Sequence, residues 1–241
     1  MQGTMRVIRR LIVLIFVLCP LLALGLIAFL PGPHRAIAPA QFGLSRIAPG
    51  VYTDAPTRQA ELTQLLARAD SRVAAIFGSA TPRPRTVLCT AEPCRATFGL
   101  TGRAITLGDL AVVVAPLGIR EATLVHEQIH IELSARMGPL DALWPRYPAW
   151  FNEGLATHIS GTPGVLGPAR VADAQWITSA QTALGWRLAK RGRTGAEYYG
   201  AARRLVAEIE AQIGTPALVD LIEDVAQGAD FRQTLDLDLA R

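Results

Sequence analysis

Two histidines four residues apart, His126 and His130, constrain the fold of this chain more than any other feature. On an α-helix, residues i and i+4 lie on one face about 5 to 6 Å apart, so both imidazoles can reach one metal ion where the chain is helical. The segment 119–137 contains no proline, carries apolar residues at helical spacing, and ends before a Gly-Pro pair. The sequence therefore predicts a helix that presents both histidines to one ion.

The residue types of this H-E-x-x-H motif favour zinc. A catalytic zinc site takes three protein ligands, accepts histidine nitrogen, and leaves a fourth position for water. Glu127 follows the first histidine by one residue, so it can reach that water rather than the ion and act as a general base. We expect one Zn²⁺ per chain. A structural helix that carries two surface histidines and no metal is the alternative.

The third ligand must come from elsewhere in the chain. Glu132 is excluded because, two residues beyond the second histidine, it points about 200° around the helix. Asp141 lies in a turn rich in glycine and proline and has no supporting motif around it. Glu153 is the better candidate, because it lies in a second predicted helix that starts after Pro148 and ends near Gly161.

A second motif surrounds this glutamate. H-E-x-x-H followed about twenty residues later by W-F-N-E-G-L-A (150–156) resembles the gluzincin metallopeptidases, the clan that contains thermolysin-like and aminopeptidase N-like enzymes. The resemblance implies that Glu153 is the third zinc ligand beside the two histidines, and that Glu127 is the general base of peptide-bond hydrolysis. Gly154 and Ala156 are small, which would allow the two helices to approach closely.

Members of that clan often carry a tyrosine on a later helix that stabilises the oxyanion of the tetrahedral transition state. Tyr199 matches, because an apolar stripe at helical spacing follows it at Ala202, Val206 and Ile209. A phenol that donates to the developing oxyanion would stabilise the transition state. Tyr198 is the alternative donor, and a plain core tyrosine is the alternative role.

Two departures from the best-known members of the clan bear on activity. Thr157 occupies the position where thermolysin-like enzymes have an aspartate that supports a zinc histidine. The chain also has no G-x-M-E-N motif for a substrate amine, so exopeptidase activity is not indicated. Two alternatives therefore stay open: a catalytically inactive zinc-binding protein that acts as a binding or assembly factor, and a metal-free envelope module.

The N-terminal part of the chain predicts a membrane anchor. Residues 11–30 are an uncharged, apolar run long enough to cross a bilayer as a helix, and a basic flank, 1–10, precedes them. By the positive-inside rule the flank stays in the cytoplasm and the rest faces outward, into the periplasm in a Gram-negative cell. Residues 31–49 are expected to form a Pro- and Ala-rich linker to a zincin-like domain over 50–241. A cleaved signal peptide is the alternative to the anchor.

Cysteine usage agrees with an outward-facing domain. Cys89 and Cys94 are the only cysteines after the apolar run. In an oxidising compartment they would close a small disulfide loop, with two free thiols as the alternative. No second cysteine pair completes a zinc ribbon, so the H-E-x-x-H motif offers the better metal site.

Charge argues against a nucleic-acid partner. The formal net charge is +4, but three of the positive charges belong to the N-terminal flank. No basic stripe with interleaved aromatic residues follows. The expected partners are a peptide or protein substrate and the membrane, and the oligomeric state is left open.

The remaining patterns predict an α+β fold, in which a small sheet leads into the active-site helix and a mostly helical C-terminal lobe follows. The expected elements are a helix over 56–77, strands over 86–90, 104–107 and 111–115, and helices beyond residue 171. In the resembling clan an edge strand over the cleft pairs with extended substrate. The run 111–115 is the candidate for that strand, with Val113, Val114 and Ala115 against the peptide.

Overall fold

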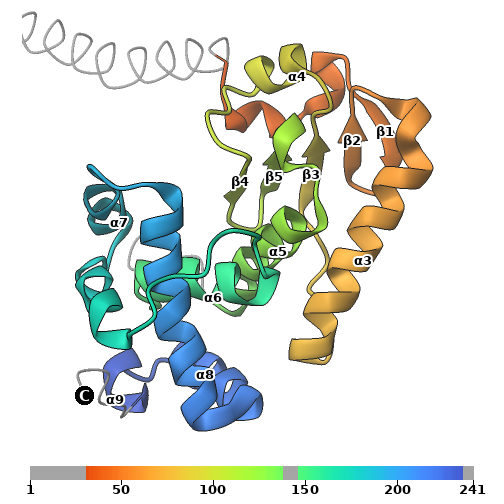
Figure 1. Cartoon of the computed structure of the whole chain (residues 1–241). Helices are drawn as coiled ribbons and strands as arrows, with labels where there is room; N and C mark the ends of the chain where they lie inside the picture. The colour runs from red at the N-terminus through yellow and green to blue at the C-terminus, as the bar shows by residue number, and fades with distance from the viewer. Residues whose placement is uncertain (1–30, 138–145, 236–241) are drawn as a thin grey trace, which may run out of the picture.

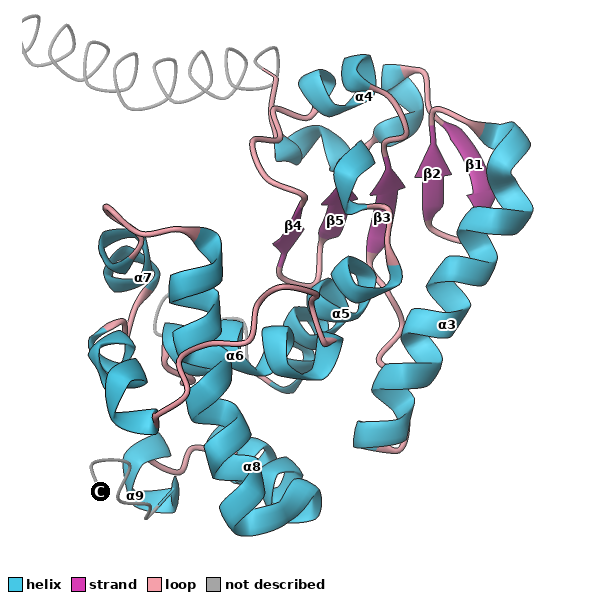
Figure 2. Ribbon diagram, viewed as in Figure 1, coloured by secondary structure: helices cyan, strands magenta, loops and turns pink. Residues whose placement is uncertain are grey.

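The computed structural model of the chain describes residues 31–137 and 146–235 (Figure 1). The membrane helix predicted for 11–30, its basic flank and Asp141 lie outside the described residues. Within the described ranges, no helix combines the length and the apolar character that a bilayer span requires. The described chain has two parts, an N-terminal lobe that contains all its strands and a C-terminal lobe built of helices (Figure 2). The predicted α+β class is confirmed.

One mixed five-stranded sheet forms the centre of the N-terminal lobe. In order across the sheet, its strands are β1 (Ser45–Ala48), β2 (Val51–Thr53), β3 (Arg85–Leu88), β5 (Ala111–Val114) and β4 (Ala104–Leu107). The outer pairs, β1 with β2 and β4 with β5, are antiparallel, and the inner pairs are parallel. The strands predicted over 104–107 and 111–115 are therefore present and pair with each other as a hairpin.

The strand expected at the edge of the sheet lies inside it. β5 pairs with β3 on one side and with β4 on the other, and Val113 and Val114 are fully buried. The prediction that Val113, Val114 and Ala115 contact an extended substrate is therefore wrong. The sequence holds the reason, because a run of alanine and valine without alternating polar residues is typical of a strand buried on both faces. The edge strand on this side is β4.

Residues 33–48, predicted as part of a linker, belong to the folded lobe instead: 33–44 pack against the sheet, and 45–48 form its strand β1. Two 3₁₀ helices, Pro33–Ile37 and Pro39–Phe42, precede β1. Ala36 and Leu44 are buried in the same apolar cluster as Val113. A segment rich in proline and alanine can pack well, because burying these small side chains costs little conformational entropy. The folded lobe therefore starts before residue 50.

Two helices cover the opposite face of the sheet. α3 (Gln59–Phe77) follows a 3₁₀ turn at Pro56–Arg58, and α5 (Glu121–Arg136) follows another at Pro116–Gly118. Both predicted helices are present, each with a 3₁₀ turn just before it. Their apolar faces join the sheet in one core, which includes Leu62, Leu66, Val73, Leu124, Val125 and Ile129.

The C-terminal lobe consists of helices packed around α6. Its elements are α6 (Ala149–Ser160), a 3₁₀ helix (Val171–Ser179), α7 (Ala183–Ala189), α8 (Gly195–Ala226) and α9 (Phe231–Leu235). α6 packs against both α5 and α8 and so connects the two lobes. α8 is bent at Gly214, where φ is 83°.

Gly154 sets how closely α6 and α8 approach. A Cβ atom at this position would lie 2.6 Å from the carbonyl oxygen of Ala202, which is closer than van der Waals contact allows. We expect from the sequence that this small residue faces the helix of the two histidines, α5, whereas it faces α8. The close packing fixes the position of α6, which carries Glu153 next to Gly154.

Candidate metal centre

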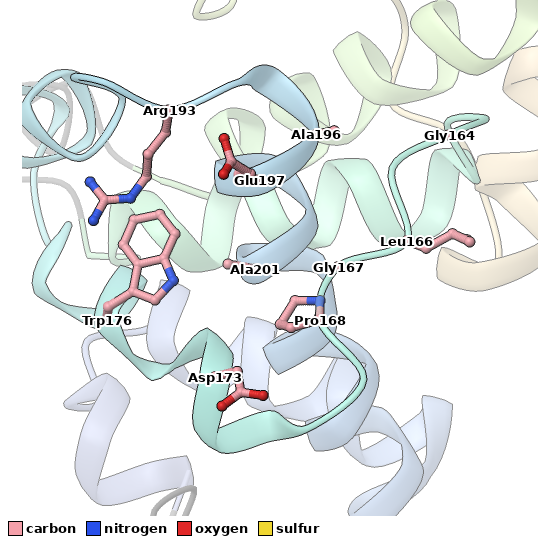
Figure 3. Close-up of a pocket in the computed structure, with 10 residues that line it drawn as sticks. All are labelled: Gly164, Leu166, Gly167, Pro168, Asp173, Trp176, Arg193, Ala196, Glu197 and Ala201. Atoms are coloured by element: carbon pink, nitrogen blue, oxygen red, sulfur yellow. The ribbon is translucent and has the colours of Figure 1, made fainter.

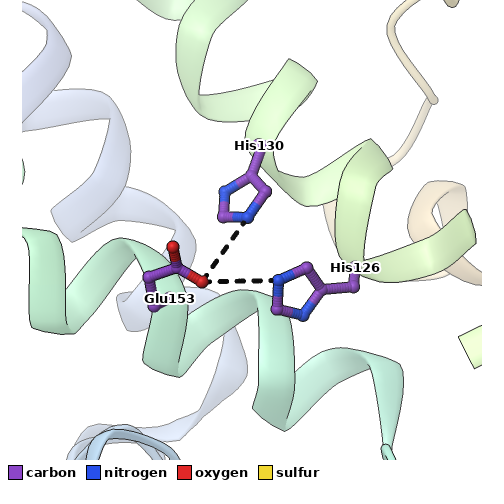
Figure 4. Close-up of side chains that lie close together, drawn as sticks. All are labelled: His126, His130 and Glu153. Carbon is purple, nitrogen blue, oxygen red and sulfur yellow. Dashed lines mark ion pairs between the residues drawn. The ribbon is translucent and has the colours of Figure 1, made fainter. Parts of the chain in front are cut away.

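Three side chains from two helices converge where α5 and α6 cross (Figure 4). Glu153 Oε2 lies 3.5 Å from His126 Nε2 and 3.8 Å from His130 Nε2. The candidate ligand atoms all lie within 4.8 Å of one another. The side chains are mostly covered, with 14 %, 17 % and 23 % of their surface exposed for His126, His130 and Glu153. The predicted His-His-Glu group is therefore assembled.

The donor set fits a divalent metal ion. In a tetrahedral site with bonds of roughly 2.0 to 2.1 Å, neighbouring ligand atoms are about 3.3 Å apart. The two separations from Glu153 Oε2 need only a small contraction to reach this value, and the widest separation, within 4.8 Å, needs a larger side-chain movement. Glu153 Oε2 is buried and accepts no hydrogen bond, which leaves an acceptor that an ion could satisfy. The group could bind a metal ion, and its geometry alone does not identify which one.

Aromatic packing holds α6 in the position that aims Glu153 at α5. Trp150 and Phe151 are buried, and their rings contact each other and Phe231 of α9. The first turn is also tied to the chain before α7, because the Trp150 amide donates to the Ala180 carbonyl. Trp150 and Phe151 of the W-F-N-E-G-L-A motif thus anchor α6, and the next two residues, Asn152 and Glu153, face the histidines.

The electrostatics of the group favour a cation between the three ligands. Burial opposes protonation of His126, but interaction with Glu153 and the charge of Glu127 outweigh it and raise the pKa of His126. Burial likewise opposes ionisation of Glu153, but the two histidines and Lys190 lower its pKa. Without metal, the site therefore attracts a proton to His126 and keeps Glu153 ionised.

Glu127 lies beside the ligands with one oxygen held by the sheet. Its side chain is buried, and Thr106 Oγ1 donates to its Oε2 atom at 2.6 Å. Thr106 belongs to the edge strand β4, so this hydrogen bond links the predicted base to the rim of the sheet. Thr106 is not among the site residues predicted from the sequence, where its only signal is that it is a polar residue in a predicted strand.

Asn152 is the second functional candidate that the sequence analysis missed. Its Oδ1 atom lies 2.6 Å from His130 Nδ1. With this oxygen as the acceptor, Nδ1 carries the proton and the Nε2 lone pair faces Glu153, which is the form a metal ligand needs. Thr157, at the position of the thermolysin-like aspartate, donates instead to the Glu153 carbonyl of its own helix. The signal for Asn152 was its place next to Glu153.

Tyr199 contacts the metal-centre residues, and Tyr198 lies behind it. The Tyr199 ring centroid is 6.0 Å from that of His126, and the Tyr198 ring is 4.7 Å from Tyr199. Burial first, and then the negative charge of Glu153, raise the pKa of Tyr199 well above its ordinary value, while Arg103 acts in the opposite direction. The Tyr199 phenol therefore stays protonated and can donate a hydrogen bond.

Other polar features of the molecule lie outside this group. His158 Nε2 is 2.6 Å from Glu210 Oε2 and connects α6 to α8. A pocket of about 470 Å³ lies between α8 and the chain over 164–176, where the guanidinium of Arg193 stacks on Trp176 (Figure 3). None of the three candidate ligands lines that pocket.

The predicted disulfide between Cys89 and Cys94 is present. Cys89 follows β3, and Cys94 lies in α4 (Glu92–Thr97), so the bond fixes α4 to the sheet. α4 lies at the end of the sheet remote from α6 (Figure 1). The disulfide therefore stabilises the N-terminal lobe without contacting the metal centre.

Comparison with known proteins adds no relative from which a function could be transferred. The chain matches no protein-family model, no curated protein and no solved structure among those compared. The proposals below depend on the two motifs and on the geometry of the site.

Proposed function

We propose that this protein is a membrane-anchored, gluzincin-like zinc metallopeptidase that hydrolyses peptide bonds outside the cytoplasm. The observation that carries the proposal is the convergence of His126, His130 and Glu153 from two helices, with Glu127 beside them. Two imidazoles and one carboxylate are a ligand set of catalytic zinc sites, which keep a fourth position for water. Zinc in such a site acts as a Lewis acid and makes water a nucleophile near neutral pH.

Glu127 is proposed to move the proton. Its Oε2 atom accepts the hydrogen bond from Thr106, so Oε1 is left to accept a proton from the attacking water. The carboxyl group then returns this proton to the leaving amine. Thr106 limits the rotation of the carboxylate and is thus a positioning residue.

Tyr199 is proposed to stabilise the oxyanion. Because burial and the charge of Glu153 raise its pKa, the phenol keeps its proton and can donate it as a hydrogen bond to the negative charge that develops on the carbonyl oxygen. Of the two tyrosine rings, that of Tyr199 packs against His126, and that of Tyr198 packs against Tyr199. Tyr199 is therefore the donor we propose.

The substrate is proposed to lie along β4. This edge strand pairs with β5 on one side only, among the strands that the structure describes. An extended peptide that adds to a free edge gains main-chain hydrogen bonds that tolerate many side chains. Thr106 lies in β4 and contacts Glu127, so a peptide paired there would pass beside the proposed base.

Substitution of the base tests this function. In the full-length, zinc-loaded protein, Glu127→Gln should lower the rate of peptide hydrolysis by at least about 100-fold, because general-base catalysis contributes about 10² to 10⁴. Zinc content should not change. Glu121→Gln, on the same helix but in a partly exposed ion pair with Arg68, is the matched control and should keep normal hydrolysis.

Two outcomes would contradict the proposal. Full zinc-dependent hydrolysis by Glu127→Gln would exclude Glu127 as the base. Binding of one zinc ion by the wild-type protein without hydrolysis of any peptide in a library would instead favour the inactive zinc-binding alternative.

A further inference from the structure

Lys190 is the only lysine of the chain, and it lies near the metal centre. It directly follows α7 as the C-cap residue of that helix. Its Nζ atom lies 5.2 Å from the ring centroid of Tyr198, 5.5 Å from that of Trp186 and 5.6 Å from that of Tyr199. Among the described residues, no carboxylate forms an ion pair with this ammonium group. The rings attract the cation, but they leave its N–H donors without acceptors.

The rings that hold Lys190 also border the ligands. Trp186 is buried and contacts both tyrosines, with centroids 5.5 Å from Tyr198 and 5.4 Å from Tyr199. Three rings packed on one another restrict where the ammonium group can go. Lys190 is therefore held in place before any ligand arrives, which lowers the entropic cost of binding an anion.

Tyr199 lies between Lys190 and the metal centre, so its contacts limit the distance between them. The Tyr199 ring lies 5.6 Å from Lys190 Nζ and 6.0 Å from the His126 ring, so the two sites are separated by no more than these two steps together. An extended peptide covers that distance in about three residues, at roughly 3.3 to 3.6 Å each. The positive charge of Lys190 also helps to lower the pKa of Glu153, as expected for a cation at this range.

We propose that Lys190 and the rings of Trp186, Tyr198 and Tyr199 form a subsite that binds a carboxylate of the peptide substrate. The carboxylate is either the C-terminal group or an Asp or Glu side chain, within about three residues of the scissile bond. This inference rests on the proposed peptidase function, because it takes the metal centre as the position of the scissile bond. It names the substrate class as peptides with a negative charge close to the cleavage point.

Matched peptide pairs test the subsite. The first pair is a peptide that the full-length protein cleaves, with a free C-terminal carboxylate or with an amide, and further pairs carry Asp or Asn at each position near the scissile bond. The wild-type kcat/KM should be on the order of tenfold higher for the carboxylate member of one pair. The pair that shows the preference identifies the source of the carboxylate.

Substitutions of Lys190 separate binding from structure. Lys190→Met keeps the aliphatic stem on the rings and should lower kcat/KM about tenfold more for the carboxylate peptide than for its partner. Lys190→Arg should restore most of the preference. Arg191→Met, which changes an exposed cation of the same turn, should leave the preference unaltered. Equal losses on both members of every pair would overturn the subsite, because they would indicate a structural role.

A binding measurement distinguishes failure of the subsite from failure of the peptidase function. Calorimetric Kd values for the same pairs can be measured on zinc-loaded Glu127→Gln protein. If no peptide is cleaved but carboxylate peptides bind more tightly and only with Lys190 present, the peptidase function is wrong and the subsite is supported. If peptides are cleaved and neither kinetics nor binding depends on Lys190, the subsite is wrong and the peptidase function is supported.

Discussion

Two covered glutamates, Glu132 on α5 and Glu153 on α6, differ in how their oxygens are satisfied. Glu132 is 1 % exposed, and it accepts hydrogen bonds from the backbone and hydroxyl of Thr81, from Gln128 and from Arg136. Glu153 faces two histidine nitrogens, and its Oε2 atom accepts no hydrogen bond. The Glu132 carboxylate thus has hydrogen-bond donors on both of its oxygens, whereas Glu153 has an oxygen without a donor.

The difference separates a structural region from a binding region. Glu132 connects α5 to the segment before β3 and, because Arg136 also pairs with Glu223, to α8. A saturated buried carboxylate of this kind holds elements together. A buried acceptor without a donor costs stability unless a ligand satisfies it. The polar groups around Glu132 thus stabilise the fold, whereas those around Glu153 could bind a metal ion.

Removal of the saturated glutamate should have the largest effect. Glu132→Ala leaves Arg136 and the Thr81 donors without their partner, and breaking a buried charge pair costs about 3 to 5 kcal/mol. We expect about 3 kcal/mol of unfolding free energy to be lost, since Arg136 keeps Glu223. Urea unfolding of the metal-free protein measures this loss. Glu223→Gln, which removes the half-exposed partner, should cost about 1 kcal/mol or less.

Removal of the unsaturated glutamate should affect metal binding instead. Glu153→Ala should weaken zinc binding by more than about 100-fold, above what the loss of an outer hydrogen-bond partner costs. Its metal-free unfolding free energy should change by less than about 1 kcal/mol. Zinc titration against a competing chelator measures the first quantity. His158→Gln changes a histidine of α6 outside the group and should bind zinc normally. A similar loss of zinc affinity in this variant would show that the effect is not specific to the Glu153 group.

Loss of the Asn152 contact should produce a smaller effect. Asn152→Ala removes the acceptor that orients His130, and such partners contribute about 10- to 100-fold to metal affinity. We expect a loss near the lower end, because the ligands themselves remain. Asn152→Asp keeps an acceptor and should restore most of the affinity in the same titration. Unchanged affinity in both variants would show that His130 needs no such support.

Acidification should have the smallest effect and should act on the Glu153 region before the Glu132 region. One competing proton lowers zinc affinity by at most about tenfold per pH unit. Because the pKa of His126 is raised above the value of about 6.5 for an unperturbed histidine, protons should compete with zinc from above that pH downward. The pKa of Glu132 is lowered by Arg136 and Thr81 against the effect of burial, so its contribution to stability is present above its usual pKa and is lost only as pH falls through the lowered value. Zinc affinity should thus fall before circular dichroism detects unfolding.

The helices and the three candidate ligands could be predicted because their signals are local. Helical spacing places His126 and His130 on one face, and Pro148 and Gly161 predicted the bounds of the second helix, which carries Glu153 within the W-F-N-E-G-L-A motif. The disulfide was likewise visible as a close cysteine pair in an outward-facing domain.

The errors and omissions arose where distant segments meet. The apolar run of β5 indicates burial on both faces, but sheet order depends on pairing between remote strands, so this run does not identify β3 and β4 as its neighbours. Thr106 reaches Glu127 across 21 residues, through the register of β4. Asn152 is adjacent to Glu153, but whether it faces His130 depends on how α6 crosses α5.

X-ray absorption spectroscopy at the zinc edge, on the full-length protein with one equivalent of Zn²⁺, tests most directly whether His126, His130 and Glu153 bind one ion together. The account predicts two imidazole nitrogens at roughly 2.0 to 2.1 Å and oxygen ligands from a carboxylate and water. A decrease of the imidazole scattering to that of one histidine in His126→Ala would agree with this. Sulfur scattering at roughly 2.3 Å, or a protein that binds no zinc, would contradict it.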